Sequence, residues 1–145
     1  MSTFYVAYGS NLNLSQMRFR CPSAEILGTG MLKDYQLYFC YYLTVVPQEG
    51  AEVPVAVWKI DDDCEDSLDY YEGFPNFYRK ETVRVEIDGE TVEAMIYIMN
   101  RFVPELPGRS YYNDVTEGYR DFKLDECYLL DALGETYMLI GENAS

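Results

Sequence analysis

Hydrophobic residues along the chain occur mostly in short runs or at alternate positions, the spacing that β-strands require. The first run, residues 3–8, is rich in aromatic and β-branched residues and stops at Gly9, so it predicts a buried strand followed by a turn. Residues 82–87 and 91–99 flank Asp88-Gly89, a pair typical of a tight hairpin. Further strands are predicted at residues 24–32, 35–46, 54–59 and, near the end of the chain, 137–140.

Helical spacing, with apolar residues three or four positions apart, occurs in four segments. Asn13 and Gln16 fit a capping box that would start the first helix, and Pro22 would end it. The aspartates at 61–63 would cap a second helix, which would stop at Gly73. Two more helices are predicted at residues 111–122 and 125–133, and loops at 47–52 and 100–110.

The length of 145 residues suits one domain, spanning residues 1–145. About six or seven strands with few helices predict an α+β fold with a curled or closed sheet. Hydrophobic residues make up 48% of the chain, enough for a substantial core, which excludes a disordered acidic tail.

The chain is strongly acidic, with 11 Lys and Arg against 25 Asp and Glu, so the net charge is 11 − 25 = −14. A nucleic-acid partner is not expected, because binding phosphates needs clustered cations. The longest uncharged stretch, residues 35–48, is too short to cross a membrane, and no cationic leader precedes an apolar run. We therefore expect a cytoplasmic protein with no membrane role.

The absence of histidine excludes Ser-His-Asp and Cys-His catalysis and any imidazole metal site. The cysteines are widely spaced without a C-x-x-C pair, so we expect buried free thiols and neither a zinc site nor a compact disulfide framework: Cys21, Cys40, Cys64 and Cys127. The acidic run at 61–63 lacks the spacing of a calcium loop. No metal site is expected.

The first candidate site is the loop between the first strand and the first helix. Its backbone N–H groups lack strand partners, and Gly9 would let a ligand approach the backbone closely, so the loop could hold an anion. An ordinary turn has the same sequence signature. The loop consists of Tyr8, Gly9, Ser10, Asn11 and Leu12.

The second candidate is Glu72, at the predicted end of the helix that follows residues 61–63. Phe74 and Phe77 come directly after it, an apolar setting that would raise the pKa of the carboxyl group. A carboxyl group that titrates near neutrality could carry protons in a chain without histidine. The alternative is a solvated glutamate at a helix end.

These segments together resemble the gamma-glutamylcyclotransferases. The motif YGSNL at residues 8–12 ends a strand, and the segment SLDYYEG at 67–73 is similar to the family's L-D-x-x-E-G. Between them lie CPSA at 21–24, GMLKDYQLYF at 30–39 and VAVWKI at 55–60, the last similar to the family's G-V-V-W-K strand. The resemblance covers residues 3 to about 100 and is looser at 110–119, where Tyr111 aligns better than Tyr112.

The resemblance implies a small mixed β-barrel flanked by helices, with no metal or organic cofactor. The implied reaction converts a γ-glutamyl amide, a small-molecule substrate, to 5-oxoproline and releases an amine, with Glu72 as general acid and base. Substrate contacts are implied for Tyr8, Gly9, Ser10, Asn11, Leu12, Tyr78 and Tyr111.

Three readings of function remain open at this stage. The leaving group could be an amino acid, a peptide or an amine, and the last would make the protein a related cyclotransferase acting on γ-glutamylamines. A noncatalytic binding module could share the same fold. Two segments depart from the family, the shorter stretch at 73–77 and the loop at 100–110, and both would shape the leaving-group pocket.

Overall fold

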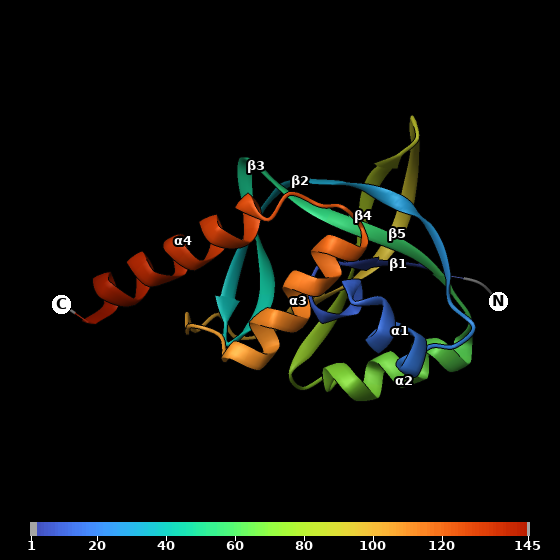
Figure 1. The fold of residues 1–145 in the computed structure, drawn as a ribbon, viewed down its shortest axis with the longest axis horizontal. Coiled ribbons are helices and arrows are strands. Elements are labelled where there is room, and N and C mark those ends of the chain that lie inside the picture. The colour runs from blue at the N-terminus through green and yellow to red at the C-terminus, as the bar shows by residue number, and fades with distance from the viewer. Residues whose placement is uncertain (1–2, 145) are drawn as a thin grey trace.

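Five strands form one mixed sheet in the computed structural model, which describes residues 3–144 (Figure 1). The central strand β1 runs antiparallel to β3 and parallel to β5, and the strand order is β2-β3-β1-β5-β4. The loop that follows β1 therefore starts from the middle of the molecule. The strands are β1 (Thr3–Ala7), β2 (Glu25–Cys40), β3 (Tyr42–Ile60), β4 (Tyr78–Ile87) and β5 (Glu90–Met99).

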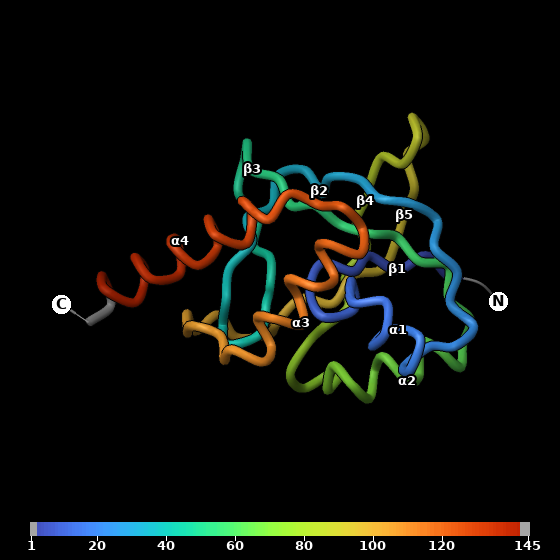
Figure 2. The backbone as a smooth tube through the Cα atoms, in the orientation of Figure 1, coloured from blue at the N-terminus to red at the C-terminus, as the bar shows by residue number. Residues whose placement is uncertain are grey.

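A short 3₁₀ turn and the first α-helix follow β1 directly, and α1 contacts α2 (Figure 1). The last helix, α4, extends away from the sheet toward the C-terminal end (Figure 2). None of the helices within residues 3–144 is long and apolar enough to cross a membrane. The helices are η1 (Ser10–Leu12), α1 (Leu14–Arg20), α2 (Asp62–Glu72), α3 (Arg109–Asp121) and α4 (Cys127–Ala144).

The predicted strand at 35–46 is wrong in extent, because the chain reverses within it. Tyr41 has a φ of 64° and links β2 to β3, with Cys40 paired to Tyr42. The predicted loop at 47–52 is also wrong, since these residues belong to β3. The pairing of β3 with β2 shifts its register in this region, between Lys33 and Tyr35 of β2. The apolar residues continue through the reversal without Gly, Asn or Pro, so the sequence carries no ordinary turn signal there.

The α+β class and the mixed sheet are confirmed, but the predicted barrel is not closed. The edge strands β2 and β4 are not paired with each other. They nevertheless approach closely, because a Cβ atom on Gly30 would lie 2.5 Å from the carbonyl oxygen of Glu86 and one on Gly28 would lie 2.9 Å from Ile87. Glycines on β2 thus let the sheet curl until its two edges touch.

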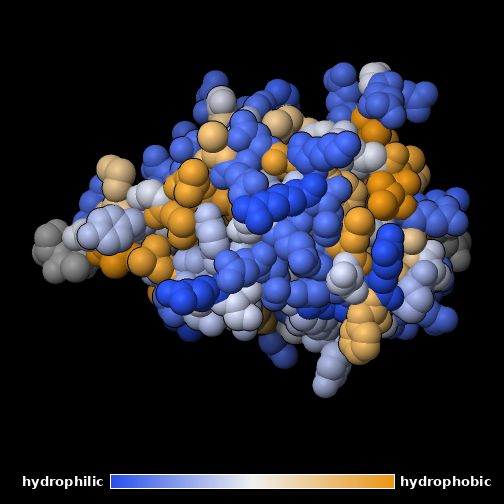
Figure 3. All heavy atoms as spheres, viewed as in Figure 1, coloured by the Kyte–Doolittle hydropathy of each residue, from blue (hydrophilic) through white to orange (hydrophobic). Residues whose placement is uncertain are grey.

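The predicted strand at 137–140 is wrong, because this segment is part of α4. Three residues at helical spacing, Leu129, Ala132 and Thr136, are fully buried, and the Thr136 hydroxyl accepts a hydrogen bond from the Phe39 N–H at 2.9 Å. Packing against β2 thus stabilises a helix here, although residues 137–140 have the composition of a strand. Other apolar residues of α4, including Leu130 and Met138, are exposed, and Figure 3 shows hydrophobic side chains along this helix.

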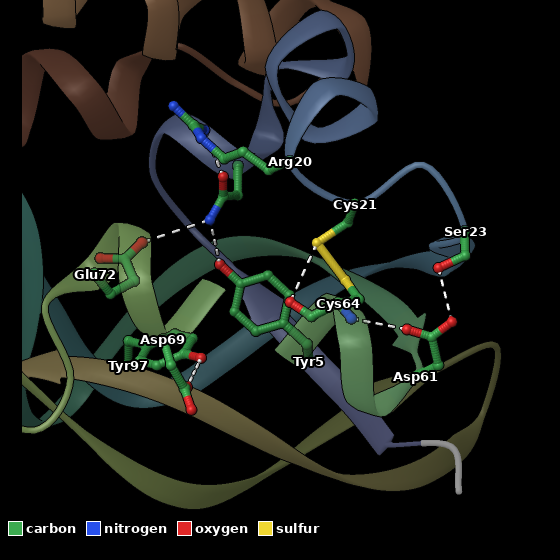
Figure 4. The surroundings of a disulfide bond; sticks show 10 residues. Tyr5, Arg20, Cys21, Ser23, Asp61, Cys64, Asp69, Glu72 and Tyr97 are labelled. Atoms are coloured by element: carbon green, nitrogen blue, oxygen red, sulfur yellow. Dashed lines mark hydrogen bonds between the residues drawn. A yellow bond between two sulfur atoms is a disulfide. The ribbon is translucent and has the colours of Figure 1, made fainter. Parts of the chain in front are cut away.

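The cysteine prediction is wrong for one pair. Cys21, which follows α1, forms a disulfide with Cys64 of α2 (Figure 4). The two residues are 43 positions apart in sequence and are brought together by the contact between the two helices. Cys40 is a buried free thiol as expected, whereas Cys127 is free but exposed.

Candidate active site

A cavity of about 310 Å³ lies where the end of β1, the η1 turn and the end of α2 meet. Residues of β3, β4, β5 and α3 complete its wall. Among the described residues, Glu72 is the only charged one that lines this cavity, and most of the others are aromatic. The lining consists of Tyr5, Val6, Tyr8, Gly9, Ser10, Asn11, Tyr42, Leu43, Tyr70, Tyr71, Glu72, Gly73, Phe77, Tyr78, Tyr97 and Tyr111.

Seven of the eight residues expected from sequence line this cavity, and Leu12 does not. The Leu12 side chain is fully buried in the core, and its N–H donates to the Gly9 carbonyl at 3.0 Å. Its amide is therefore engaged inside the η1 turn. Within the segments that depart from the family, Gly73 and Phe77 line the cavity, whereas none of residues 100–110 does.

Helix α2 delivers Glu72 to the cavity because its two ends are fixed. The Asp61 side chain caps its first turn by accepting from the Cys64 N–H at 2.8 Å. Gly73 ends the helix with a φ of 66°, and the Phe74 N–H donates to the Asp69 carbonyl at 2.9 Å, as in a Schellman motif. Glu72 is thus held as the last helical residue, next to a turn.

Glu72 is partly exposed as a residue, but its carboxyl group is largely removed from water. This desolvation raises the pKa of Glu72 to about 7, although the nearby Arg20 guanidinium acts in the opposite direction. The Asn11 side-chain nitrogen lies 3.5 Å from Oε1 of Glu72. Glu72 is therefore not a fully solvated helix-end glutamate.

Three tyrosines of the cavity are held by hydrogen bonds to backbone groups. The Tyr78 hydroxyl donates to the Leu43 carbonyl at 2.9 Å, and the Tyr111 hydroxyl accepts from the Leu43 N–H at 3.0 Å. The Tyr8 hydroxyl donates to the Tyr97 carbonyl at 2.6 Å. Burial raises the pKa of Tyr8, Tyr78 and Tyr111, so all three remain neutral.

Of the two adjacent candidates on α3, Tyr111 faces the cavity and Tyr112 does not. The ring of Tyr112 packs against Phe39 with the centroids 6.0 Å apart. The Tyr111 oxygen would lie only 3.1 Å from a Cβ atom on Gly9. Glycine at position 9 is therefore what allows α3 to place this hydroxyl against the loop.

Sequence reasoning missed several residues that complete the site. The Tyr5 hydroxyl accepts from the Asn11 side-chain nitrogen at 2.8 Å, and the Tyr71 hydroxyl lies 3.0 Å from the Ser10 hydroxyl. Arg20 donates to Oδ1 of Asn11 at 2.6 Å. Tyr71 could have been found by its position beside Glu72, whereas no local signal connects Arg20 with Asn11.

The expected capping box at the start of α1 is half present. The Asn13 side chain accepts from the Gln16 N–H at 3.2 Å, as the motif requires. The Gln16 side chain, however, accepts from Arg20 at 2.8 Å and is not directed at the Asn13 backbone. Gln16 thus supports Arg20.

Within residues 3–144 no group of three or more Cys, Asp or Glu side chains is arranged to hold a metal ion.

Comparison with known proteins places this geometry in a family. The chain is 28% identical to human gamma-glutamylcyclotransferase over 134 residues, which span 83% of this chain and 71% of the human protein. The mouse gamma-glutamylcyclotransferase is 26% identical over 138 residues, covering 86% of this chain and 73% of the mouse protein.

A solved structure of a gamma-glutamyl cyclotransferase has a similar fold, with a TM-score of 0.79 at 26% identity over 91% of this chain and 86% of that one. Residues 5–119 match the family described as "Gamma-glutamyl cyclotransferase, AIG2-like", a stretch that begins in β1 and ends in α3 and so includes every element that lines the cavity. The chain therefore belongs to the gamma-glutamyl cyclotransferase, AIG2-like family.

Proposed function

We propose that this protein is an enzyme that converts a γ-glutamyl amide to 5-oxoproline and releases the amine. The observation that carries the proposal is a carboxyl group, Glu72, whose pKa is raised to about 7 by desolvation in the wall of a cavity. Titratable groups with such shifts are common where proton transfer is catalysed. Membership of the family supports the same reaction.

In the proposed reaction the substrate supplies both reacting groups. The α-amine attacks the γ-carbonyl carbon, a new C–N bond closes the five-membered ring, and the bond to the leaving nitrogen breaks. Oriented intramolecular reactions reach effective molarities on the order of 10⁵ M or more, so holding the substrate folded provides much of the acceleration. The protein's first task is therefore to hold the chain in this conformation.

Proton transfer is the second task, and we assign it to Glu72. The attacking amine must lose a proton, and the leaving nitrogen must gain one. One carboxylate between the two nitrogens can accept the first proton and then donate it, a contribution of about 10² to 10⁴ in rate. A pKa near 7 suits both steps at neutral pH.

We assign substrate binding to the loop and to the neutral tyrosines around it. Gly9, Ser10 and Asn11 would contact the γ-glutamyl group, while Tyr111 retains a proton to donate after accepting from Leu43. The outer wall is aromatic, since Tyr42 and Phe77 line the cavity and remain 42% and 47% exposed. This rim would contact the leaving group.

We expect the purified protein, without added metal and with EDTA present, to release 5-oxoproline from at least one γ-glutamyl substrate. The panel should contain a γ-glutamyl amino acid, a γ-glutamyl peptide and a γ-glutamylamine. The matched α-glutamyl compounds are the control, because they lack an amide at the γ-carbon that ring closure could displace. Binding of the panel without any release would instead support a noncatalytic module, and loss of turnover on chelation would refute the carboxylate-only mechanism.

Gly9→Val is expected to impair substrate binding more than folding. The first side-chain atom would lie 3.1 Å from the Tyr111 hydroxyl and 3.7 Å from the Leu43 side chain, so it would fill the approach to the loop. We expect KM to rise by at least about 10-fold, a larger relative effect than the accompanying fall in melting temperature. Gly141→Val is the control, because nothing lies within 4 Å of that position. Wild-type KM and kcat in Gly9→Val would mean that the loop is only a turn.

A further inference from the structure

Arg20 lies outside the cavity wall but contacts two of the segments that form it. It is the last residue of α1, and the next residue, Cys21, is joined to Cys64 of α2 by the disulfide (Figure 4). The backbone that carries Arg20 is therefore anchored to the helix that carries Glu72. Arg20 Nη2 also donates to Oε1 of Gln16 at 2.8 Å, which holds the guanidinium in place.

The guanidinium determines which way the Asn11 amide faces. Its Nη1 donates to Oδ1 of Asn11 at 2.6 Å, and because a guanidinium has no acceptor, only the amide oxygen can occupy that position. The Asn11 nitrogen must then point the other way, where it lies 2.8 Å from the Tyr5 hydroxyl and 3.5 Å from Oε1 of Glu72. Without Arg20 the amide could flip and present its oxygen to the carboxylate.

The same guanidinium packs on Tyr71, the residue before Glu72. Its central carbon lies 3.5 Å from the centroid of the Tyr71 ring, and the Tyr71 hydroxyl is 3.0 Å from the Ser10 hydroxyl. Arg20 thus contacts the η1 loop through Asn11 and the end of α2 through Tyr71. Loss of this side chain would remove a contact from both segments at once.

Among the described residues, Arg20 is also the cation whose charge acts on the Glu72 carboxyl group. The titratable groups that interact with the carboxyl group, besides Arg20, are phenols whose pKa is raised chiefly by burial, so they stay neutral: Tyr5 on β1, Tyr8 directly after β1, Tyr78 on β4 and Tyr111 on α3. Tyr71 of α2 and Tyr97 of β5 line the same cavity. The Glu72 carboxyl group therefore responds to the guanidinium and to no second cation in this set.

We propose that Arg20 is a positioning residue for the reaction: it turns the Asn11 amide nitrogen toward Glu72 and fixes Tyr71 at the end of α2. The effect on turnover rests on the proposed function, whereas the effect on the geometry and ionisation of Glu72 does not. The proposal therefore has one test that uses turnover and one that does not.

The kinetic test compares Arg20→Gln, Arg20→Lys and a control, Arg18→Gln, an exposed arginine on the same helix. Arg20→Gln should lower kcat/KM by about 10- to 100-fold, the range for losing a charge-assisted hydrogen bond at a buried group. It should also move the acidic limb of the kcat profile to higher pH, because removing the cation disfavours the ionised carboxylate. Arg20→Lys should keep the limb near its wild-type pH but recover only part of kcat/KM, since an ammonium lacks the planar fork.

A double mutant shows whether Arg20 acts through Asn11. On the alkaline plateau, adding Arg20→Gln to Asn11→Ala should lower kcat/KM by much less than Arg20→Gln does alone, because only the contribution through Tyr71 is left to lose. Fully additive losses would overturn the proposal. So would a lower melting temperature in Arg20→Gln with unchanged kcat/KM and an unchanged pH limb, which is the result expected of a purely structural arginine.

The second test titrates the Glu72 side-chain carboxyl carbon by ¹³C NMR and needs no substrate. Its midpoint should rise in Arg20→Gln and stay at the wild-type value in Arg18→Gln. An unchanged midpoint in Arg20→Gln overturns the proposal. Failure of the wild-type protein to release 5-oxoproline would refute the proposed function, and the titration would still decide the role of Arg20.

Discussion

Glu72→Gln is expected to stay folded and to lose at least about 10²-fold in kcat, because the amide keeps the size of the side chain but cannot carry a proton between the two nitrogens. The Asn11 nitrogen lies 3.5 Å from Oε1 and would find an amide oxygen in the same place, so the surrounding contacts are largely preserved. The measurement is kcat for 5-oxoproline release at neutral pH, beside a thermal melt.

Glu81→Gln is the matched control for this substitution. Glu81 is a partly exposed carboxylate on β4 that pairs with Arg79 at 2.6 Å and does not line the cavity. It should keep wild-type kcat. Asp69, the other acid near the site, is bound to Lys80 at 2.9 Å and accepts from the Tyr97 hydroxyl. If Glu72→Gln retained near-normal kcat, the assignment of proton transfer to Glu72 would be wrong, and Asp69 or Glu81 would have to be tested for that role.

The wild-type kcat should rise with pH through an apparent pKa of about 7, as Glu72 becomes able to accept a proton. The ionisation of the substrate amine contributes to the same profile. A series of substrates with different amine pKa values separates the two, because the Glu72 limb stays in place while the amine limb moves. A limb that followed the amine alone would contradict the assignment.

The stability of the protein should depend on Glu72 in the opposite sense to its activity. Its pKa is raised from 4.5 to about 7 on folding, so the folded state binds the proton more tightly than the unfolded state does. The free energy of unfolding therefore falls as pH rises from 4.5 to 7, by on the order of 3 kcal/mol. Glu72→Gln should melt at a higher temperature than wild type at pH 8 and at a similar temperature at pH 4.

Gly118→Ala is expected to cause the largest loss of stability among these variants, about 2–4 kcal/mol, through overpacking against backbone. The added Cβ atom would lie 2.6 Å from the Leu12 carbonyl carbon and 2.7 Å from the Asn13 nitrogen, which cannot move aside as a flexible side chain would. Helix α3 would have to shift away from the η1 turn, and the site loop would shift with it. The measurement is the free energy of unfolding in urea, with KM measured on the folded fraction.

Gly134→Ala provides the control for the change in helix propensity. Gly134 is exposed on α4 with nothing within 4 Å of an added Cβ atom, so alanine there should stabilise the protein by about 0.5–1 kcal/mol. The two glycines sit in helices and receive the same substitution, yet the expected signs differ. A stabilised Gly118→Ala would show that α3 does not press on the loop.

The local order of the site could be read from the sequence because its signals lie close together along the chain. The strand at residues 3–8, the Asp61 cap and the stop at Gly73 depend on neighbouring residues, and each lies where it was expected. The loop at residues 8–12 therefore follows β1, and Glu72 ends α2. The hairpin at Asp88-Gly89 was predicted for the same reason.

The tertiary structure decided which distant residues meet, and no local pattern encodes that. Arg20 and Asn11 are joined across the η1 turn and α1, and Tyr71 reaches Ser10 from a helix 61 residues later. The disulfide between Cys21 and Cys64 depends on the same contact between α1 and α2. The carboxyl pKa of about 7 is likewise a property of the assembled wall, because it is the burial of Glu72 among groups from six other elements that removes its water.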